Sequence, residues 1–393
     1  MDHDRTCEAQ IMICPRSMRP QQDGFTLVEL MVGILIGMAL IAGLAITFAN
    51  SSQSFGEMQK QSQQIETGRY AFDVLRDDLE HAGYFGARTT LVATPGTAPD
   101  PCDVTVSALA TAIALPIQGY DSPATSPISC LATADHLAGT DIVVIRRADP
   151  EITTAPVSND RYIQASFGGI EVQAGNPSGF VLPALNADNT VQFVGTKATG
   201  GQVPTVLKMM NVPAASPVVT LARVAADIRK LHVHIYYVSP CSRPASGQTS
   251  CTTAADGGSP IPTLKRLELS LDSGNAAMVV RSIAEGVEDL QFDYGFDSSP
   301  TAINLATGFP GDGVIDAYAK SVSGTFAEWR NVMSARVYVL ARNPLPSAGF
   351  SDTKTYSMGL EGTYTPTATN YRRHLFEGEV RLVNLSSRRE VPK

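Results

Sequence analysis

The feature that most constrains this chain is a long, almost uncharged segment near its start. From Phe25 to Ala49 the sequence reads FTLVELMVGILIGMALIAGLAITFA, and Glu29 is its only charged residue. As a helix this segment would be about 37 Å long, which is enough to cross the hydrocarbon core of a bilayer. No later stretch of the 393 residues is comparably apolar. We therefore expect one membrane-spanning helix, residues 25–49, followed by a large part outside the membrane.

The flanking charges predict how this span is oriented. Arg16 and Arg19 precede it, and the next basic residue after it is Lys60. The positive-inside rule then places the N-terminus in the cytoplasm and the bulk of the chain across the membrane, in the periplasm. A cleaved secretory signal peptide is the alternative. It fits less well because the apolar run is long and no small-x-small site follows it.

The residues GFTLVEL at 24–30 resemble the type IV prepilin signature. The resemblance implies a leader, residues 1–24, that prepilin peptidase removes after Gly24, followed by N-methylation of Phe25. The start codon stays open between Met1, Met12 and Met18. The family has a glutamate five residues into the mature chain, which is Glu29 here, and we expect Glu29 to be an assembly contact.

A charge inside an apolar span is costly, so Glu29 needs a partner. The new α-amino group of Phe25, from the same or a neighbouring subunit, is the partner we expect. Gly33 and Gly37 form a G-x-x-x-G pattern at the same depth, which would let helices approach closely.

Further along, the chain resembles the PilW family of minor pilins. This resemblance implies a subunit that helps to initiate or cap type IV pili. It implies other minor pilins, the major pilin and a large tip adhesin as partners. Residues 85–220 carry no resemblance. The segments that carry this resemblance are AEGVEDLQFDYGFD (284–297), GDGVIDAY (311–318), WRNVMSARVYVLAR (329–342) and YRRHLFEGEVRLVN (371–384).

Helical spacing continues beyond the span, so we expect one helix from Phe25 to about Gly83. Residues 50–85 would form its soluble half. We expect its apolar stripe to pack on the globular domain. That stripe comprises Phe55, Met58, Ile65, Phe72, Leu75 and Leu79.

Residues 86–393 would form a β-rich periplasmic domain. We expect residues 89–134 to be an irregular loop with short strands, because they are rich in Thr, Ala, Pro and Ser. The later strand-like runs predict an α+β fold in which the long helix packs on a mainly antiparallel sheet. These runs are 141–146, 231–238, 263–271, 278–283, 290–296, 332–341 and 375–383.

Four cysteines lie outside the leader, in a part of the chain where oxidation is expected. Four cysteines allow three pairings. Short loops favour Cys102 with Cys130 and Cys241 with Cys251. A zinc site is the alternative, but no C-x-x-C occurs.

Two patterns are candidate metal ligands. His232 and His234 would share one strand face, which we interpret as a solvated histidine face rather than a chelate. Asp312 and Asp316 in GDGVIDAY resemble part of a calcium loop. A tight Asp-Gly turn is the preferred interpretation, and no cofactor other than calcium is suggested.

No catalytic motif is present, because the sequence lacks G-x-S-x-G, H-E-x-x-H and a phosphate-binding Gly-Lys loop. We therefore expect no enzyme. The net charge of −8 argues against a nucleic-acid binder. The C-terminal basic residues are interpreted as a solvated strand edge. They are Arg372, Arg373, His374, Arg381, Arg388 and Arg389.

The sequence thus predicts a minor pilin of the type IV pilus, placed at or near the tip and extracellular once assembled. Two alternatives stay open. One is a pseudopilin of type II secretion, of the GspJ kind, and the other is a pilin for DNA uptake.

Overall fold

The computed structural model describes residues 24–86, 98–166, 169–174, 208–209, 224–225, 227–298, 311–321 and 329–387. The chain separates into two compact units, Met1–Glu57 and Met58–Lys393. One helix, α1 (Leu27–His81), contributes to both units. Its bounds lie within two residues of those predicted from the sequence.

The first unit carries the apolar part of α1. Apart from Glu29, this part has no charged residue, and its large side chains from Phe25 to Phe48 are exposed. By length and composition α1 could cross a membrane, and it is the one such helix among the described residues. This agrees with the predicted span.

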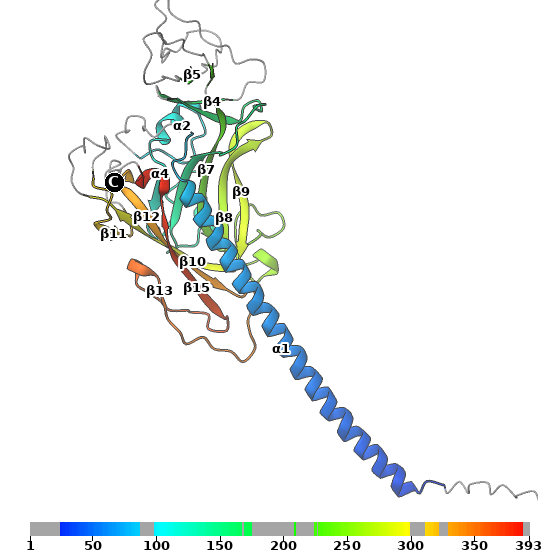
Figure 1. Cartoon of the computed structure of the whole chain (residues 1–393). Helices are drawn as coiled ribbons and strands as arrows, with labels where there is room; N and C mark the ends of the chain where they lie inside the picture. The colour runs from blue at the N-terminus through cyan, green and yellow to red at the C-terminus, as the bar shows by residue number, and fades with distance from the viewer. Residues whose placement is uncertain are drawn as a thin grey trace, which may run out of the picture. The chain divides into compact units, whose positions relative to one another are not determined.

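The second unit is built on two antiparallel sheets (Figure 1). In the larger sheet the strand order is β1-β2-β7-β3-β4, and β7 also pairs with β8, which pairs with β9. Its strands are β1 (Ile117–Tyr120), β2 (Ile142–Ala148), β3 (Arg161–Ser166), β4 (Gly169–Ala174), β7 (Ile228–Ser239), β8 (Thr263–Asp272) and β9 (Asn275–Glu285).

The smaller sheet has the order β11-β10-β12-β15. Its strands are β10 (Val287–Phe296), β11 (Ala317–Ala319), β12 (Val332–Arg342) and β15 (Arg373–Arg381). All seven strand-like runs named from the sequence are strands here, so the predicted α+β fold is confirmed.

Gly286 lies where β9 of the larger sheet turns into β10 of the smaller one. Its φ is +87°, and a Cβ there would lie 2.5 Å from the carbonyl oxygen of Arg342. Its own carbonyl accepts a hydrogen bond from the Arg342 N–H at 2.7 Å. Only glycine tolerates both this backbone conformation and this close approach, so the corner requires it.

Asp141 joins the two sheets at a second point. Its backbone N–H donates to the carbonyl of Leu290, and its carboxyl accepts the N–H of Phe292 at 2.8 Å. The other carboxyl oxygen accepts the N–H of Ser122 at 2.8 Å. Burial raises the pKa of Asp141 to about 8.

The remaining elements are short. They are α2 (Val106–Ala112), η1 (Thr133–Asp135), β5 (Lys208–Met209), β6 (Val224–Ala225), η2 (Ala255–Gly257), β13 (Tyr356–Ser357), η3 (Gly359–Glu361), β14 (Thr363–Tyr364) and α4 (Val383–Ser386).

The main core lies between the second half of α1 and both sheets. Leu75 and Leu79 of α1 are fully buried there with Val143 and Tyr236 of the larger sheet and Val337 of the smaller one. The opposite face of the larger sheet is covered by a second core that includes residues of α2. The middle strands β2 and β7 of the larger sheet are therefore covered on both faces, whereas β9 stays partly exposed.

The prediction that the whole apolar stripe of α1 packs on the domain is wrong for its first half. Phe55, Met58 and Ile65 are 73%, 66% and 51% exposed. The side that packs instead carries Gln64 and Gly68. Because Ile65 directly follows Gln64, it points about 100° away from that side around the helix.

The expectation of an irregular loop at 89–134 is also wrong in part. The helix α2 forms after Thr105, whose hydroxyl accepts the N–H of Ala108 as an N-cap. The sequence does contain a helix-start signal, because Thr105 is a favourable N-cap before the run VSALATA. The Pro and Ser residues around it favoured the prediction of a loop instead.

Candidate processing and assembly site

The residues of the processing motif lie at the start of α1. Gly24 and Phe25 precede the helix, which begins at Leu27, and the Phe25 side chain is almost fully exposed. The residues before Gly24, including Cys7 and Cys14, lie outside the described part of the chain. The bond that the motif marks for cleavage therefore lies just before the helix and outside it.

Thr26 and Glu29 form a capping box. The Glu29 carboxylate accepts the backbone N–H of Thr26 at 3.0 Å and its hydroxyl at 2.9 Å. In return the Thr26 hydroxyl oxygen accepts the N–H of Glu29 at 3.2 Å. This T-x-x-E arrangement satisfies N–H groups that the first turn of a helix leaves unpaired. Sequence reasoning treated Glu29 only as a charge in need of a partner and missed Thr26, although the spacing was visible.

Gly33 and Gly37 lie on the exposed first part of α1. A Cβ built on either glycine would meet nothing within 4 Å. The two positions are thus open in the single chain, with room for a neighbouring backbone. Their role in helix packing stays a prediction.

At the other end of α1, Asp78 anchors the helix to the larger sheet. Its carboxylate accepts hydrogen bonds from Arg147 of β2 at 2.8 Å and from His234 of β7 at 2.5 Å. The hydroxyl of Tyr236 donates to the same carboxylate. Asp78 is 2% exposed, so one helix side chain is bound inside a pocket of three sheet side chains.

The electrostatics of this anchor favour a charged Asp78. Burial opposes ionisation, but the hydrogen bond from His234 and the charge of Arg147 outweigh it and hold the pKa of Asp78 well below its usual range. Burial also raises the pKa of Tyr236. The network therefore pairs Asp78 with the Arg147 cation and adds the hydrogen bonds of His234 and Tyr236, which is how buried charge is tolerated.

The solvated histidine face expected from the sequence is wrong. His234 is 4% exposed because it lies under α1 and binds Asp78. His232 is largely covered and its Nε2 lies 3.1 Å from the Asp149 carboxylate. Burial lowers the pKa of His232 to about 4. Both histidines are thus used in packing the helix and loops onto the sheet.

The acidic loop from Gly311 forms a turn rather than a set of open ligands. Asp312 accepts the N–H of Val314 at 2.9 Å, and Asp316 accepts the N–H of Ser298 at 2.8 Å. Gly311 and Gly313 have φ values of +94° and +82°, as tight turns require. Within the described residues, no three His, Cys, Asp or Glu side chains are grouped as metal ligands.

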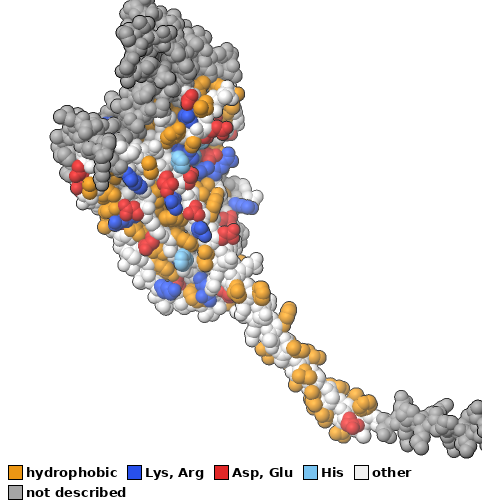
Figure 2. All heavy atoms as spheres, viewed as in Figure 1, with side chains coloured by type: hydrophobic (Ala, Val, Ile, Leu, Met, Phe, Trp, Pro, Cys, Tyr) orange, Lys and Arg blue, Asp and Glu red, His pale blue; other side chains and the backbone are white. Residues whose placement is uncertain are grey.

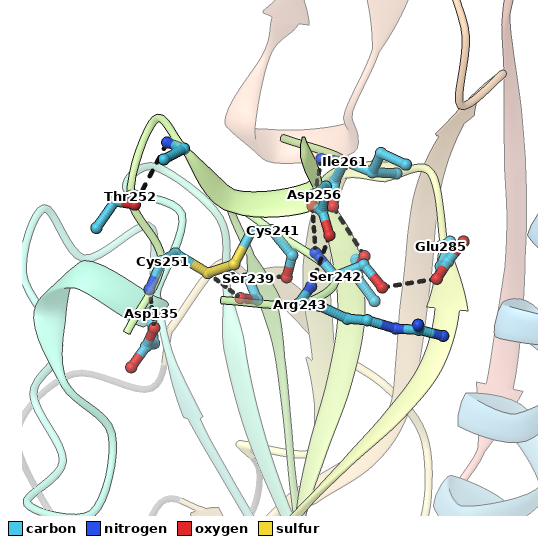
Figure 3. Close-up of a disulfide and its surroundings, with 12 residues drawn as sticks. Asp135, Ser239, Cys241, Ser242, Arg243, Cys251, Thr252, Asp256, Ile261 and Glu285 are labelled. Atoms are coloured by element: carbon cyan, nitrogen blue, oxygen red, sulfur yellow. Dashed lines mark hydrogen bonds between the residues drawn. A yellow bond between two sulfur atoms is a disulfide. The ribbon is translucent and has the colours of Figure 1, made fainter. Parts of the chain in front are cut away.

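Two disulfides staple loops of the second unit. Cys102 is bonded to Cys130 across 28 residues, and Cys241 to Cys251 across 10. Figure 3 shows the second bond beside Asp135, whose carboxylate accepts the N–H of Cys251 at 2.7 Å.

Asp256 fixes the rest of this stapled loop (Figure 3). Its carboxylate accepts the N–H groups of Ser242, Arg243 and Ile261 at 2.7–2.9 Å. The Ser242 hydroxyl in turn donates to Glu285 of β9 at 2.6 Å. The loop is therefore held by hydrogen bonds as well as by the disulfide.

The C-terminal basic residues are not simply a solvated edge. Arg373 is buried and donates two hydrogen bonds to Glu288, at 2.5 and 3.0 Å. Arg381 donates to the Ser386 hydroxyl at 2.9 Å. His374 is exposed, and Arg388 and Arg389 lie outside the described residues. The expectation was wrong for Arg373 because its ion pair partner comes from β10, 85 residues earlier.

Two protein-family models match parts of this chain. A family model described as the prokaryotic N-terminal methylation motif matches residues 19–45. Together with the apolar first half of α1, this match supports a type IV pilin or pilus-assembly protein. No curated protein and no solved structure matches the chain.

A second match is to a PilW family model. The model described as Type IV Pilus-assembly protein W matches residues 236–384, from within β7 to α4. The two resemblances stated from the sequence are thereby confirmed. The matched region contains β8 and β9 of the larger sheet and all of the smaller one.

Proposed function

We propose that this chain is a minor pilin that takes part in assembly or initiation of the type IV pilus, at or near its tip. One observation carries the proposal: a single chain joins the methylation motif on an apolar helix to the PilW region. Its partners would be prepilin peptidase, other minor pilins, the major pilin and a large tip adhesin. Its role would be structural rather than enzymatic.

The proposal divides the chain as follows. Residues 1–24 are the leader, residues 25–49 cross the inner membrane, residues 50–85 complete the helix, and residues 86–393 form the periplasmic domain. The N-terminus lies in the cytoplasm before cleavage. The mature subunit becomes extracellular when it enters the pilus.

In this proposal Glu29 has two successive uses. In the uncleaved chain it caps α1 through Thr26. After cleavage, the α-amino group of Phe25 becomes a cation one helical turn away. Glu29 would then neutralise this amine in the same or a neighbouring subunit and so set the axial register.

The experiment compares Glu29→Ala with Glu29→Gln. Glutamine can still complete a capping box but carries no charge. We expect both variants to be cleaved and inserted normally, and both to reduce co-purification with other minor pilins and the number of surface pili. Glu66→Ala, an exposed acidic position of α1 outside the span, is the matched control and should behave as wild type.

The two variants distinguish the charge of Glu29 from its capping role. If Glu29→Gln assembles like wild type while Glu29→Ala does not, the cap rather than the charge matters, and the proposed charge contact is wrong. Wild-type assembly by both variants would show that Glu29 is not an assembly contact at all.

A further inference from the structure

The outer strand β9 of the larger sheet presents one row of backbone groups to no neighbouring strand. Among the described strands, β9 pairs with β8 alone, and Figure 1 shows it beyond β8 at one side of the sheet. With 11 residues it is the longest edge strand that the structure describes in the two sheets. The N–H and C=O groups of such an edge can pair with another chain.

The turn between β8 and β9 determines which backbone groups point outward. Its two residues, Ser273 and Gly274, have φ values of 50° and 81°, as a type I′ turn requires. Such a turn closes on a hydrogen-bonded pair, here Asp272 with Asn275. Bonded and non-bonded pairs then alternate along the antiparallel ladder. Four residues therefore turn their N–H and C=O groups away from β8, namely Ala276, Met278, Val280 and Ser282.

The segment Asn275–Ser282, which we call the β9 edge, lacks the features that usually protect an edge strand. Natural sheets keep such strands from pairing with charged side chains, proline or a bulge. The β9 edge contains no proline, and Arg281 is its one charged residue. The bulge of this ladder lies past the edge. Charged side chains are otherwise spread over the visible face of the second unit (Figure 2).

The side chains along the β9 edge are mostly apolar on both faces of the sheet. Ala276 and Met278 pack against the second core, and Ile283, just past the edge, packs against the main core. Val280 lies on the same face as Met278 but is 50% exposed. An incoming strand with apolar side chains would cover Val280 and extend the second core.

Exposed carboxylates mark both ends of the β9 edge. Asp272 pairs with its first residue, and Glu285 follows its last residue closely. Within the described residues, neither carboxylate is paired with a cation. Arg281, in contrast, is bound to Glu268 at 2.9 Å. A partner strand with a basic residue at each end would therefore be complementary in charge.

A second copy of this chain does not fit the β9 edge in a membrane. Antiparallel pairing of two identical edges requires a two-fold axis perpendicular to the sheet. This axis reverses the direction of the α1 segment that packs on the sheet through Leu75 and Leu79. Two copies anchored in one membrane need α1 to run in the same direction, so the partner is a strand of another protein.

We propose that the β9 edge pairs with an extended apolar segment of another pilin subunit, and that this segment carries a basic residue at each end. Backbone hydrogen bonds would supply affinity, and side chains at alternate positions would supply specificity. The inference rests on the proposed function, because it takes the partner from the pilus assembly. It adds the surface through which the second unit contacts that partner.

The test uses the full chain in phosphatidylcholine nanodiscs and two synthetic peptides as probes. Both peptides alternate valine with threonine, but one has lysine at each end and the other has glutamate. Hydrogen exchange is measured at single amides of β9. We expect the four outward amides to exchange rapidly in the free chain. The lysine peptide should slow them on the order of fivefold, as a new backbone hydrogen bond does, and the glutamate peptide should not.

Val280→Pro should abolish this slowing. Proline has no N–H, but at an outward-facing position of an edge strand it removes no bond to the neighbouring strand. Continued slow exchange at Ala277 and Val279 will show that β9 still pairs with β8. Val280→Thr keeps the N–H, so this matched control should respond like the wild type. The double variant Asp272→Lys with Glu285→Lys should respond to the glutamate peptide instead.

Unchanged exchange with both peptides, an equal response to both, or a response that survives Val280→Pro would overturn the proposal. A doubled mass in light scattering that Val280→Pro abolishes would also overturn it, because a second copy would then be the occupant. In cells, Val280→Pro should lose co-purification with the other minor pilins, and Val280→Thr should keep it. Failure of the proposed function is distinguishable, because wild-type chain would then be absent from pili while the peptide results stay the same.

Discussion

The His234 ring of β7 lies 2.5 Å from the carboxylate of Asp78 in α1, with both side chains almost fully buried. The two residues are 156 positions apart in sequence. Their contact, shared with Arg147 and Tyr236, fixes how far along the sheet and at which rotation α1 lies.

Removing the carboxylate at this contact should destabilise the second unit strongly. Asp78→Ala leaves the largely buried Arg147 without this counter-ion, and loss of one partner costs about 3–5 kcal/mol in buried pairs. The free energy of unfolding in urea, measured in detergent, checks this. The control is Asp73→Ala, an exposed acidic position of the same helix, which should change it by less than about 0.5 kcal/mol. Equal effects of the two variants would contradict the anchor.

The same contact predicts a pH dependence. The folded-state pKa of Asp78 lies below its unfolded value, so the unfolded chain binds a proton more readily. The stabilisation is then fully present above the unfolded pKa and is lost as pH falls below about 4 toward the folded value. Unfolding curves between pH 7 and pH 3 should show this loss in the wild type. The loss should be smaller in Asp78→Asn, and an equal loss in both would contradict the assignment.

Close packing of α1 on the smaller sheet depends on Gly68. A Cβ at this position would lie 2.2 Å from the Phe376 ring and 2.9 Å from the Ala341 Cβ. We expect Gly68→Ala to lower the free energy of unfolding by about 1–3 kcal/mol, as overpacking does. Gly56→Ala, where a Cβ meets nothing within 4 Å, should be neutral or slightly stabilising. Equal effects of Gly68→Ala and Gly56→Ala on the free energy of unfolding would contradict this close packing at Gly68.

The two disulfides should contribute unequally. The loop-entropy relation gives about 3.6 kcal/mol for the 28-residue separation of Cys102 and Cys130 and about 2.7 kcal/mol for the 10-residue separation of Cys241 and Cys251. Serine pairs at each position should lower the midpoint of urea unfolding in that order. Peptide mapping without reductant should recover these two pairings. A crossed pairing would contradict the structure.

Thr26 should stabilise the start of α1 in the uncleaved chain. Loss of its hydroxyl in Thr26→Val removes an N-cap worth about 1 kcal/mol. We expect faster hydrogen exchange at residues 27–30 in nanodiscs. Thr47→Val, which removes a hydroxyl bonded to the Gly43 carbonyl inside the helix, should leave these residues unchanged. Unaltered exchange in Thr26→Val would mean that the capping box has no influence there.

Much of the fold could be predicted from sequence because its signals are local. The apolar run and the continued helical spacing predicted α1. The strand-like runs predicted β2, β7, β8, β9, β10, β12 and β15. The burial of Asp78, His234 and Arg373 could not be predicted, because each depends on a partner from a distant element. The prediction that Met58 and Ile65 pack on the domain was wrong for a related reason. Sequence periodicity shows that a helix has an apolar side, but not that a glutamine and a glycine form the side that packs.

Some residues of the candidate site could likewise be predicted from the sequence, and others could not. The motif at Gly24, Phe25 and Glu29 is contiguous, so it was visible at once. The T-x-x-E spacing of Thr26 and Glu29 was also contiguous, but from the sequence Glu29 was assigned only to the amine of Phe25 and Thr26 was given no capping role. The anchor at Asp78 had no signal beyond an acidic residue in an otherwise apolar helical face.

The most direct test of the account is the mass of the N-terminal peptide of this chain in sheared pili. We predict a peptide that begins with N-methylated Phe25 and lacks Cys7 and Cys14, present at low abundance relative to the major pilin. Gly24→Val should retain the leader and be absent from the pili. An intact leader on wild-type chain in cells with active prepilin peptidase, or absence of the processed chain from the pili, would contradict the account.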